Sequence, residues 1–220
     1  MQKEIYFTSE SLHQTSTEML KEVIDYRQRH ANITLQPGSA ALLVLDMQEY
    51  FLLPDSHAFI PSAPPIIPGI QSLVSIFSSH NRPVIFTRHL NTVEDAGMMS
   101  IWWKDLLQAD SLGSGIISGL DTSHGVILNK NQYDAFHETP LITLLQKKKI
   151  RQVIITGLMT HLCCETTARS AFIQGYVVFF VVDGTATYTE SFHRGSLLSL
   201  SHGFAVPILV DEILGAFKDG

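Results

Sequence analysis

The sequence centres on one stretch, Val153-Ile-Ile-Thr-Gly157-Leu-Met-Thr-His-Leu-Cys163-Cys-Glu-Thr-Thr-Ala-Arg169. Its apolar beginning predicts a short buried strand that ends at Gly157, and Thr160 is a suitable N-cap for a helix to about Gln174. Cys163 then lies in the first helical turn, where backbone N–H groups lack intrahelical partners and the helix dipole is positive. A thiol there loses its proton more readily, and the free N–H groups can hold an oxyanion. The alternative is a cysteine that only packs, since free cysteine is commonly buried.

Length and composition favour one α/β domain with a large core, because the 220 residues are 45% apolar and only 16% charged. The net charge is −6 and the one basic run is 147–149, so nucleic acid is not an expected partner. The two cysteines, Cys163 and Cys164, are adjacent, which excludes a disulfide framework and predicts a reducing compartment. The start of the chain has no apolar leader and no segment is long enough to span a bilayer, so we expect a cytoplasmic protein without membrane contacts.

Apolar runs alternate with helical segments along the chain. The predicted strands are residues 40–45, 83–87, 125–128, 153–156, 176–182 and 204–210, and the predicted helices are 9–30, 69–80, 98–108, 139–149, 160–174 and 190–201. This alternation predicts a three-layer αβα fold of the Rossmann-like type, in which a doubly wound, six-stranded parallel sheet has helices on both faces. We expect a single domain over residues 1–220, with residues 1–36 as a helical arm that packs on the domain or on a second subunit.

Three residues with chemically useful side chains follow apolar strands: Asp46, Lys130 and Cys163. Carboxyl ends of parallel strands meet at one edge of the sheet, where ligand sites of such folds lie. Alone, an Asp after a strand is usually a turn residue and a Lys is usually solvated. Together, Asp46 can take the thiol proton and return it to a leaving group, Lys130 can hold Asp46 ionised and lower the thiol pKa, and Cys163 can attack a carbonyl carbon.

Four segments resemble the isochorismatase-like cysteine hydrolases, in the order that this family has and over about residues 35–212. They are Leu43-Val-Leu-Asp46-Met-Gln-Glu-Tyr-Phe51, Lys130-Asn-Gln-Tyr-Asp-Ala-Phe136 with Thr139-Pro-Leu141, the stretch from Gly157 to Arg169, and Gly175-Tyr-Val-Val178 leading to Asp183. The resemblance implies six parallel strands, a catalytic triad of Asp46, Lys130 and Cys163, and a homo-oligomer, usually a dimer or a tetramer. It also implies a cis peptide bond between Leu158 and Met159 and an oxyanion hole formed by the amides of Met159 and Cys163.

Further residues are candidates for the substrate pocket. They are Gln48, Phe51, Arg88, His89, Trp103, Tyr133 and His161. Trp103 is preferred over its neighbour Trp102, for which helical core packing is the alternative, and a structural hydrogen bond is the alternative for Gln48. Cys164 stands where most relatives have Val, which favours a packing role, and Asp183 is expected to tie a turn.

Two departures from the family bear on function. Its nicotinamidases hold a metal with an Asp-x-His pair after the second strand, whereas this chain has His89 and Asn91 there, so we expect neither a metal nor another cofactor. Its true isochorismatases generally replace the nucleophile by Gly or Ser and carry an Arg before the Trp as a carboxylate clamp. Here Cys163 is present, and Arg88 is the nearest cation.

These observations leave three hypotheses open. The first is a cysteine hydrolase that cleaves a small carboxamide, ureido or related C–N substrate through a thioester. The second is an isochorismatase-type vinyl ether hydrolase in which Asp46 is the acid and Cys163 a bystander. The third is a non-enzymatic thiol or scaffold protein. In the first two, the partner is a small-molecule substrate.

Overall fold

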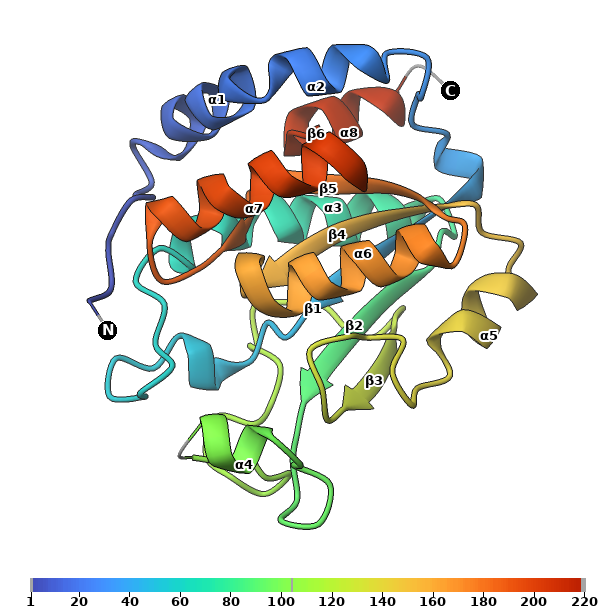
Figure 1. The fold of residues 1–220 in the computed structure, drawn as a ribbon. Coiled ribbons are helices and arrows are strands. Elements are labelled where there is room, and N and C mark those ends of the chain that lie inside the picture. The colour runs from blue at the N-terminus through green and yellow to red at the C-terminus, as the bar shows by residue number, and fades with distance from the viewer. Residues whose placement is uncertain (1, 104, 219–220) are drawn as a thin grey trace.

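A computed structural model of the chain describes residues 2–103 and 105–218. Within them, six parallel strands form one sheet with the order β3-β2-β1-β4-β5-β6 (Figure 1). The strands are β1 (Ala40–Leu45), β2 (Val84–His89), β3 (Val126–Lys130), β4 (Gln152–Leu158), β5 (Val177–Ala186) and β6 (Val206–Ile208). The strand order runs outward from β1 on one side and from β4 on the other, so the predicted doubly wound sheet is confirmed.

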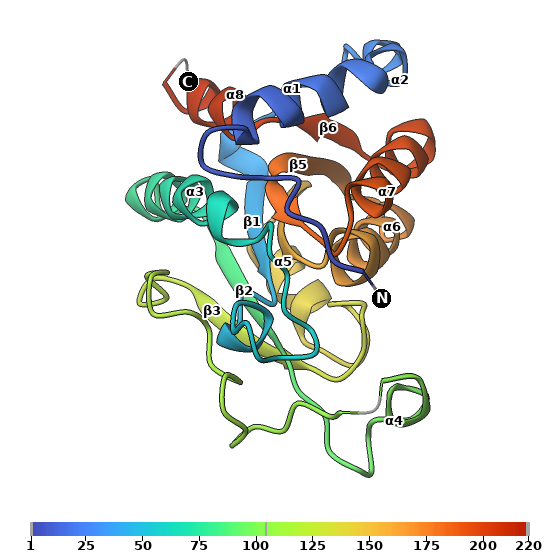
Figure 2. The same ribbon diagram turned by 90° about the vertical axis from the view of Figure 1, so that its left-hand side faces the viewer.

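Helices cover both faces of this sheet. They are α1 (Leu12–Glu22), α2 (Ile24–Arg29), α3 (Ile67–Ser79), α4 (Met99–Trp102), α5 (Leu141–Lys147), α6 (Glu165–Ile173), α7 (Glu190–Gly203) and α8 (Val210–Ala216), with short turns η1 (Pro37–Ser39), η2 (Glu49–Phe51), η3 (Pro64–Ile66) and η4 (Thr160–Cys164). Figure 2 shows α3 and α8 on one face of the sheet and α6 and α7 on the other. None of the described helices combines the length and the apolar character that crossing a membrane requires.

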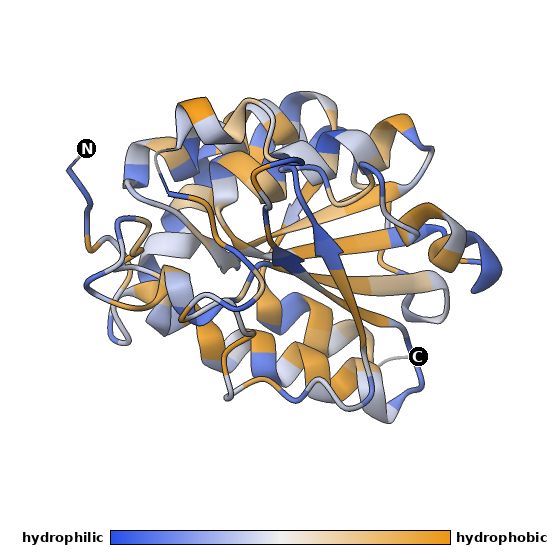
Figure 3. Ribbon diagram, turned by 90° about the horizontal axis from the view of Figure 1, so that it is seen from below, coloured by the Kyte–Doolittle hydropathy of each residue, from blue (hydrophilic) through white to orange (hydrophobic). Residues whose placement is uncertain are grey.

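The core lies on both faces of the central strands. Every residue of β1 is fully buried, because β1 lies between β2 and β4 and is covered by helices on each side. The strands are hydrophobic along most of their length, whereas the helices carry both hydrophobic and hydrophilic turns (Figure 3). This burial fixes the positions of the strand ends and therefore also of the side chains that directly follow each strand.

The N-terminal arm packs along the β6 end of the sheet. Helices α1 and α2 lie against α7 (Figure 1), and ion pairs join Arg27 to Glu212 and Glu22 to Arg194. The expected continuous helix over 9–30 is divided at Val23, whose φ of −109° and ψ of 11° end α1 before α2 begins.

Several predicted boundaries were wrong. The helix expected over 98–108 is the single turn α4, and Trp103 is already extended, with ψ of 117°. Strand β4 does not end at Gly157 but continues to Leu158, which pairs with Ala186 of β5. Lys130 is the last residue of β3 and not a residue beyond it, and α8 had no counterpart among the predicted helices.

Candidate active site

The carboxyl edge of the sheet brings Asp46, Lys130 and Cys163 together. Asp46 follows β1, Lys130 ends β3, and Cys163 lies in η4 after β4. Lys130 Nζ is 2.7 Å from Asp46 Oδ2 and 3.4 Å from Cys163 Sγ, and both charged side chains are fully buried. The acid, the ammonium and the thiol therefore form one contiguous cluster, as their strand-end positions predict.

Thr87, in β2, fixes the Asp46 carboxylate. Its hydroxyl donates to Asp46 Oδ1 at 2.6 Å and accepts from the Asp46 backbone N–H at 3.1 Å. Asp46 itself has a φ of 49°, a left-handed conformation that is costly for a residue with a Cβ and is found at functional sites. Thr87 was not predicted from the sequence, although a polar residue directly after Val84, Ile85 and Phe86 is a signal that could have indicated it.

The Lys130 ammonium is also held by groups outside the cluster. Its Nζ donates to Gln132 O at 2.9 Å and lies 3.4 Å from His89 Nδ1. The other ring nitrogen of His89, Nε2, lies 2.8 Å from Asn91 Oδ1. Burial lowers the pKa of His89 to about 4, so the ring is neutral at neutral pH, with Nδ1 accepting from Lys130 and Nε2–H donating to Asn91.

The charges of the cluster follow from burial and proximity. Burial alone would raise the pKa of Asp46, but the Lys130 ammonium and the other neighbouring groups together outweigh burial and keep the pKa below its usual value. In the same way, burial opposes the ammonium, but the Asp46 carboxylate raises the pKa of Lys130. Burial raises the pKa of the Cys163 thiol to about 12, so the expectation of an easily ionised thiol was wrong for this state of the protein. The resting cluster is a carboxylate, an ammonium and a neutral thiol.

The turn that presents Cys163 differs from the predicted helix start. Met159 is extended and precedes the π-helical turn η4, and Thr160 makes no side-chain cap, so the N-cap prediction was wrong. The peptide bond between Leu158 and Met159 is cis, which confirms that expectation. Gly157 has a φ of +106°, and a Cβ there would lie 2.0 Å from the Leu45 carbonyl oxygen, so only glycine fits between β4 and β1.

A cavity of about 70 Å³ opens above the cluster. Its lining includes both Met159 and Cys163, together with four of the predicted pocket residues, Phe51, His89, Trp103 and Tyr133. Most of the remaining lining is aromatic or aliphatic, and Trp103 Nε1–H donates to Tyr133 Oη at 2.5 Å. Asp46 and Lys130 lie beneath this lining, so the thiol is the member of the cluster that a ligand in the cavity meets.

The rim of the cavity includes four residues that were not predicted from the sequence: Tyr50, His57, Asp105 and Tyr188. His57 Nδ1 lies 2.7 Å from Tyr50 Oη and 3.0 Å from Asp105 Oδ2. Tyr50 lies in η2 and the other three residues lie in loops, and no local motif marks them.

Three predicted pocket residues do not line the cavity. Gln48 is fully buried, and its side chain forms hydrogen bonds with the backbone of His89 and Ser114. It therefore has the structural role that was the alternative to a place in the pocket. Arg88 donates to the Ser114 carbonyl at 3.0 Å. His161 points toward the end of β5, where its Nδ1 lies 2.5 Å from Thr187 Oγ1. Each side chain is turned away from the cavity by a specific partner.

The site does not fit a metal ion. Ligand-type atoms of Asp46, His89 and Cys163 lie within 4.8 Å of one another. However, Lys130 Nζ is within 3.4 Å of an atom of each, so a cation at bond lengths of about 2.0 to 2.3 Å would meet the ammonium. Asn91, at the position of the second metal ligand in nicotinamidases, uses its Oδ1 on His89 and its Nδ2 on the Asn131 carbonyl.

Comparison with known proteins agrees with this geometry. The family profile described as Isochorismatase domain matches residues 40–212. Nicotinamidase 3 of Arabidopsis thaliana is 39% identical over 79% of this chain and 86% of its own length. Enterobactin synthase component B of Escherichia coli K12 is 30% identical over 90% of this chain and 70% of its own length.

Among solved structures, a cysteine hydrolase from Pseudomonas syringae pv. phaseolicola 1448A superposes with a TM-score of 0.80 and 26% identity, covering 84% of this chain and 95% of that one. The chain therefore belongs to the isochorismatase family. It is a hydrolase of that family, which sets aside the hypothesis of a non-enzymatic protein.

Proposed function

We propose that this hydrolase cleaves the C–N bond of a small carboxamide, ureide or related substrate, with Cys163 as nucleophile, Asp46 as general base and acid, and Lys130 as the charge that holds them. The observation that carries the proposal is the buried Asp46–Lys130 ion pair beneath a cavity whose lining includes the Cys163 thiol. The name of the Arabidopsis relative, a nicotinamidase, supports an amide substrate.

The first half of the proposed reaction forms a thioester. Cys163 Sγ attacks the carbonyl carbon as its proton passes to Asp46, and the carbonyl electrons move to the oxygen. The amide N–H groups of Met159 and Cys163 stabilise that oxyanion. The tetrahedral adduct then collapses, the C–N bond breaks, and the leaving nitrogen takes the proton from Asp46.

The second half returns the enzyme to its resting state. A water molecule gives a proton to Asp46 as its oxygen attacks the thioester carbon. The C–S bond breaks, and the sulfur regains a proton from Asp46. The balance is one amide and one water consumed, and one carboxylic acid and one amine or ammonia released.

The charge state of the cluster supports this division of roles. Because the pKa of Cys163 is raised to about 12 and that of Asp46 is lowered, the proton resides on sulfur until substrate arrives. General-base catalysis during attack is therefore more consistent with the site than a preformed thiolate. The Lys130 ammonium stabilises the negative charge whether it is on the carboxylate or on the sulfur, since Nζ contacts both.

Vinyl ether hydrolysis is the second candidate, because Enterobactin synthase component B and an Isochorismatase of Bacillus subtilis are 30% and 28% identical to the chain. In that reaction Asp46 would protonate the substrate and Cys163 would be a bystander. Arg88, the nearest cation that could substitute for the missing carboxylate clamp, donates to the Ser114 carbonyl and is not part of the cavity lining. The two candidates therefore differ most sharply in whether the thiol is needed.

The test pairs a chemical trap with a substitution. After a screen of small carboxamides and ureides, acid quench during turnover should leave an acyl mass on the peptide that contains Cys163. Cys163→Ala should abolish turnover, whereas Cys164→Ala should retain it, because Cys164 is fully buried in the core and outside the cavity lining. If Cys163→Ala turns over the best substrate as fast as the parent, covalent catalysis is wrong and the vinyl ether candidate is favoured.

A further inference from the structure

Residues 3–7, at the start of the chain, lie outside the region that the family profile matches. They run past the first turn of α7 before α1 begins (Figure 1). We propose that this segment positions the active site, through the cavity wall at one end and through the turn that presents Cys163 at the other. The inference rests on the proposed function for its kinetic consequences, but its central readout is the reactivity of a thiol and needs no substrate.

The first contact point is the cavity wall. Lys3 Nζ donates to the His57 carbonyl at 2.6 Å and lies 5.1 Å from the centre of the Tyr188 ring. The Glu4 N–H donates to the Tyr188 carbonyl at 2.8 Å. His57 and Tyr188 both line the cavity and come from separate loops. Lys3 and Glu4 therefore connect His57 and Tyr188, two residues of the cavity wall, to the same short segment.

The second contact point is a chain of hydrogen bonds that is buried at Tyr6 and leads toward the turn that bears the nucleophile. Tyr6 Oη accepts from the Thr187 N–H at 2.9 Å and lies 3.0 Å from His193 Nδ1. Thr187 Oγ1 lies 2.5 Å from His161 Nδ1, and His161 belongs to η4, two residues before Cys163. Thr187 therefore links the Tyr6 hydroxyl, through its backbone N–H, to His161 in the turn that bears the thiol, through its side chain.

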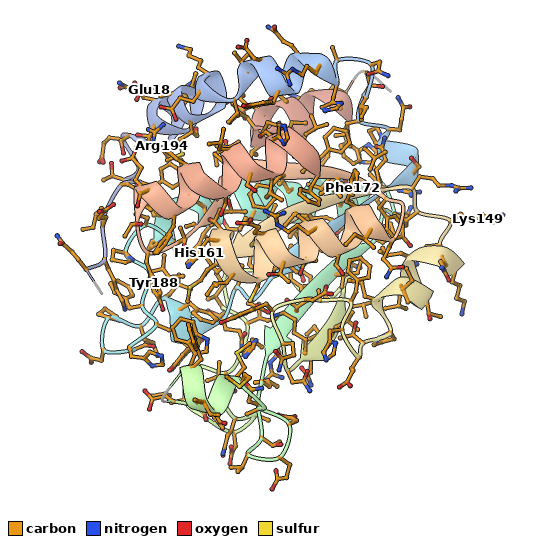
Figure 4. All side chains as sticks on the ribbon, viewed as in Figure 1. Glu18, Lys149, His161, Phe172, Tyr188 and Arg194 are labelled. Carbon is orange, nitrogen blue, oxygen red and sulfur yellow. The ribbon has the colours of Figure 1, made fainter. Side chains whose placement is uncertain are left out.

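The far end of this chain is fixed by aromatic packing. The His161 ring stacks on Phe192 of α7, with centroids 4.3 Å apart and planes 3° from parallel. Its centroid lies 6.3 Å from that of Tyr188, and Figure 4 shows the two labelled side chains on the same side of the molecule. The wall contact and the turn contact therefore converge on neighbouring residues, and His161 acts as a positioning residue for Cys163.

The segment itself is firmly held, as a positioning element must be. Ser62 Oγ accepts from the Tyr6 and Phe7 backbone N–H groups, at 2.9 and 3.3 Å, and donates to the Glu4 carbonyl at 3.0 Å. Phe7 is fully buried, and Glu4 Oε2 accepts from the Glu190 N–H at 2.9 Å at the start of α7. These contacts hold the Tyr6 hydroxyl at a fixed position relative to Thr187 and His193.

The decisive experiment compares Tyr6→Phe with Tyr26→Phe. Both variants remove one phenolic hydroxyl from the N-terminal region, but Tyr26 Oη makes no hydrogen bond within residues 2–103 and 105–218. Below the melting temperature of each variant, we measure the rate at which iodoacetamide modifies Cys163, identified by peptide mass, and kcat for the best amide. Tyr6→Phe should slow both rates on the order of tenfold, because small misplacements of a reacting group are costly. Tyr26→Phe should leave both rates unchanged.

A second pair of variants tests the wall contact. Lys3→Ala should raise KM several-fold with little change in kcat, because it loosens His57 and Tyr188 without touching η4. Lys21→Ala, which removes an exposed lysine from α1, is the matched control and should change neither constant.

Two results would overturn the proposal. One is a Tyr6→Phe protein with a lowered melting temperature but parental alkylation and turnover while folded, which would make the segment purely structural. The other is an equal effect of the two tyrosine variants. If no amide is hydrolysed by the parent, the proposed function fails, but the alkylation rates of Cys163 still decide whether residues 3–7 position the thiol.

Discussion

Thr87 illustrates how one hydroxyl can set the chemistry of a buried carboxylate. It bonds to both Asp46 Oδ1 and the Asp46 N–H, so it fixes the rotamer of the acid and the left-handed backbone that carries it. With Oδ1 held by Thr87, Oδ2 faces the Lys130 ammonium. In the reaction we propose, the carboxylate exchanges a proton with the thiol without changing its own position.

We expect Thr87→Val, which keeps the shape and removes the hydroxyl, to lower kcat by about tenfold or more, since proton transfer depends on the position of the acid. It should also lower the free energy of unfolding by about 1 to 3 kcal/mol, because a buried acceptor loses its donor. Steady-state kinetics and denaturant titration measure the two effects. Thr143→Val, on the exposed face of α5, is the matched control. Parental kcat in Thr87→Val would show that Asp46 needs no such support.

The Lys130 ammonium also bears on metal dependence. Because Nζ lies between the three side chains with ligand-type atoms, we propose that the proton chemistry of Asp46 and Cys163 runs without a metal ion. Dialysis against a chelator should leave the turnover of the best substrate unchanged, with a dialysed sample without chelator as control. Stoichiometric zinc or iron in the purified protein, combined with activity lost on its removal and restored on its return, would contradict this expectation.

At the scale of elements, the sequence predicted the strands better than the turns. The run 40–45 is the whole of β1, because a strand buried on both faces has a continuous apolar sequence. Gly157 was misinterpreted because glycine commonly ends a strand, whereas here it is needed inside β4, where a Cβ would collide with the Leu45 carbonyl oxygen. Thr160 has a good capping side chain, but Met159 is the last extended residue and takes the cap position.

Some residues of the candidate site could likewise be predicted from the sequence, and others could not. Asp46, Lys130 and Cys163 could be predicted because topology brings the ends of parallel strands to one edge. Tyr50, His57, Asp105 and Tyr188 could not, since each lies in or beside a loop whose path depends on contacts with other loops. Among the predicted wall residues, Trp103 lines the cavity although the helix expected around it is a single turn. Its place depends on the bond to Tyr133, which sequence periodicity does not encode.

At the scale of the whole molecule, we propose that residues 1–220 work as one domain, because the N-terminal segment is bonded into the interior. His193 marks this junction. It is fully buried between Tyr6 and Thr185, and its ring packs edge-on against Tyr6 and Phe7. A neutral imidazole can accept from Tyr6 at Nδ1 and donate to Thr185 at Nε2, whereas a charged ring would lose the acceptor.

This buried ring makes stability depend on pH in a direction that can be derived. Burial lowers the pKa of His193 to about 3, against about 6.5 in an unfolded chain. Between these values the unfolded chain binds a proton that the folded protein does not, so the free energy of unfolding falls as pH decreases through this window. The full difference corresponds to about 5 kcal/mol, at about 1.4 kcal/mol per pH unit.

Asp183 acts in the opposite direction over part of the same range. Its Oδ1 accepts from the Val210 N–H, and burial raises its pKa to about 6. Between about pH 4 and 6 the folded protein therefore binds a proton that the unfolded chain lacks, and this contribution to stability is lost as pH rises. It offsets part of the His193 effect, so the parent alone does not isolate either residue, and a variant is required.

We therefore expect His193→Gln, which retains an acceptor but cannot titrate, to lose less stability than the parent between pH 6.5 and 4. Denaturant titrations at a series of pH values give the free energy of unfolding of both proteins, and their difference removes the contribution of Asp183. The variant should be the less stable protein at pH 7, because its side chain packs less well against Tyr6 and Phe7, and the gap should narrow by a few kcal/mol as pH falls. His13→Gln, at an exposed position of α1, should keep the parental pH dependence. A gap that stays constant with pH would mean that the His193 ring takes up its proton as readily in the folded protein as in the unfolded chain.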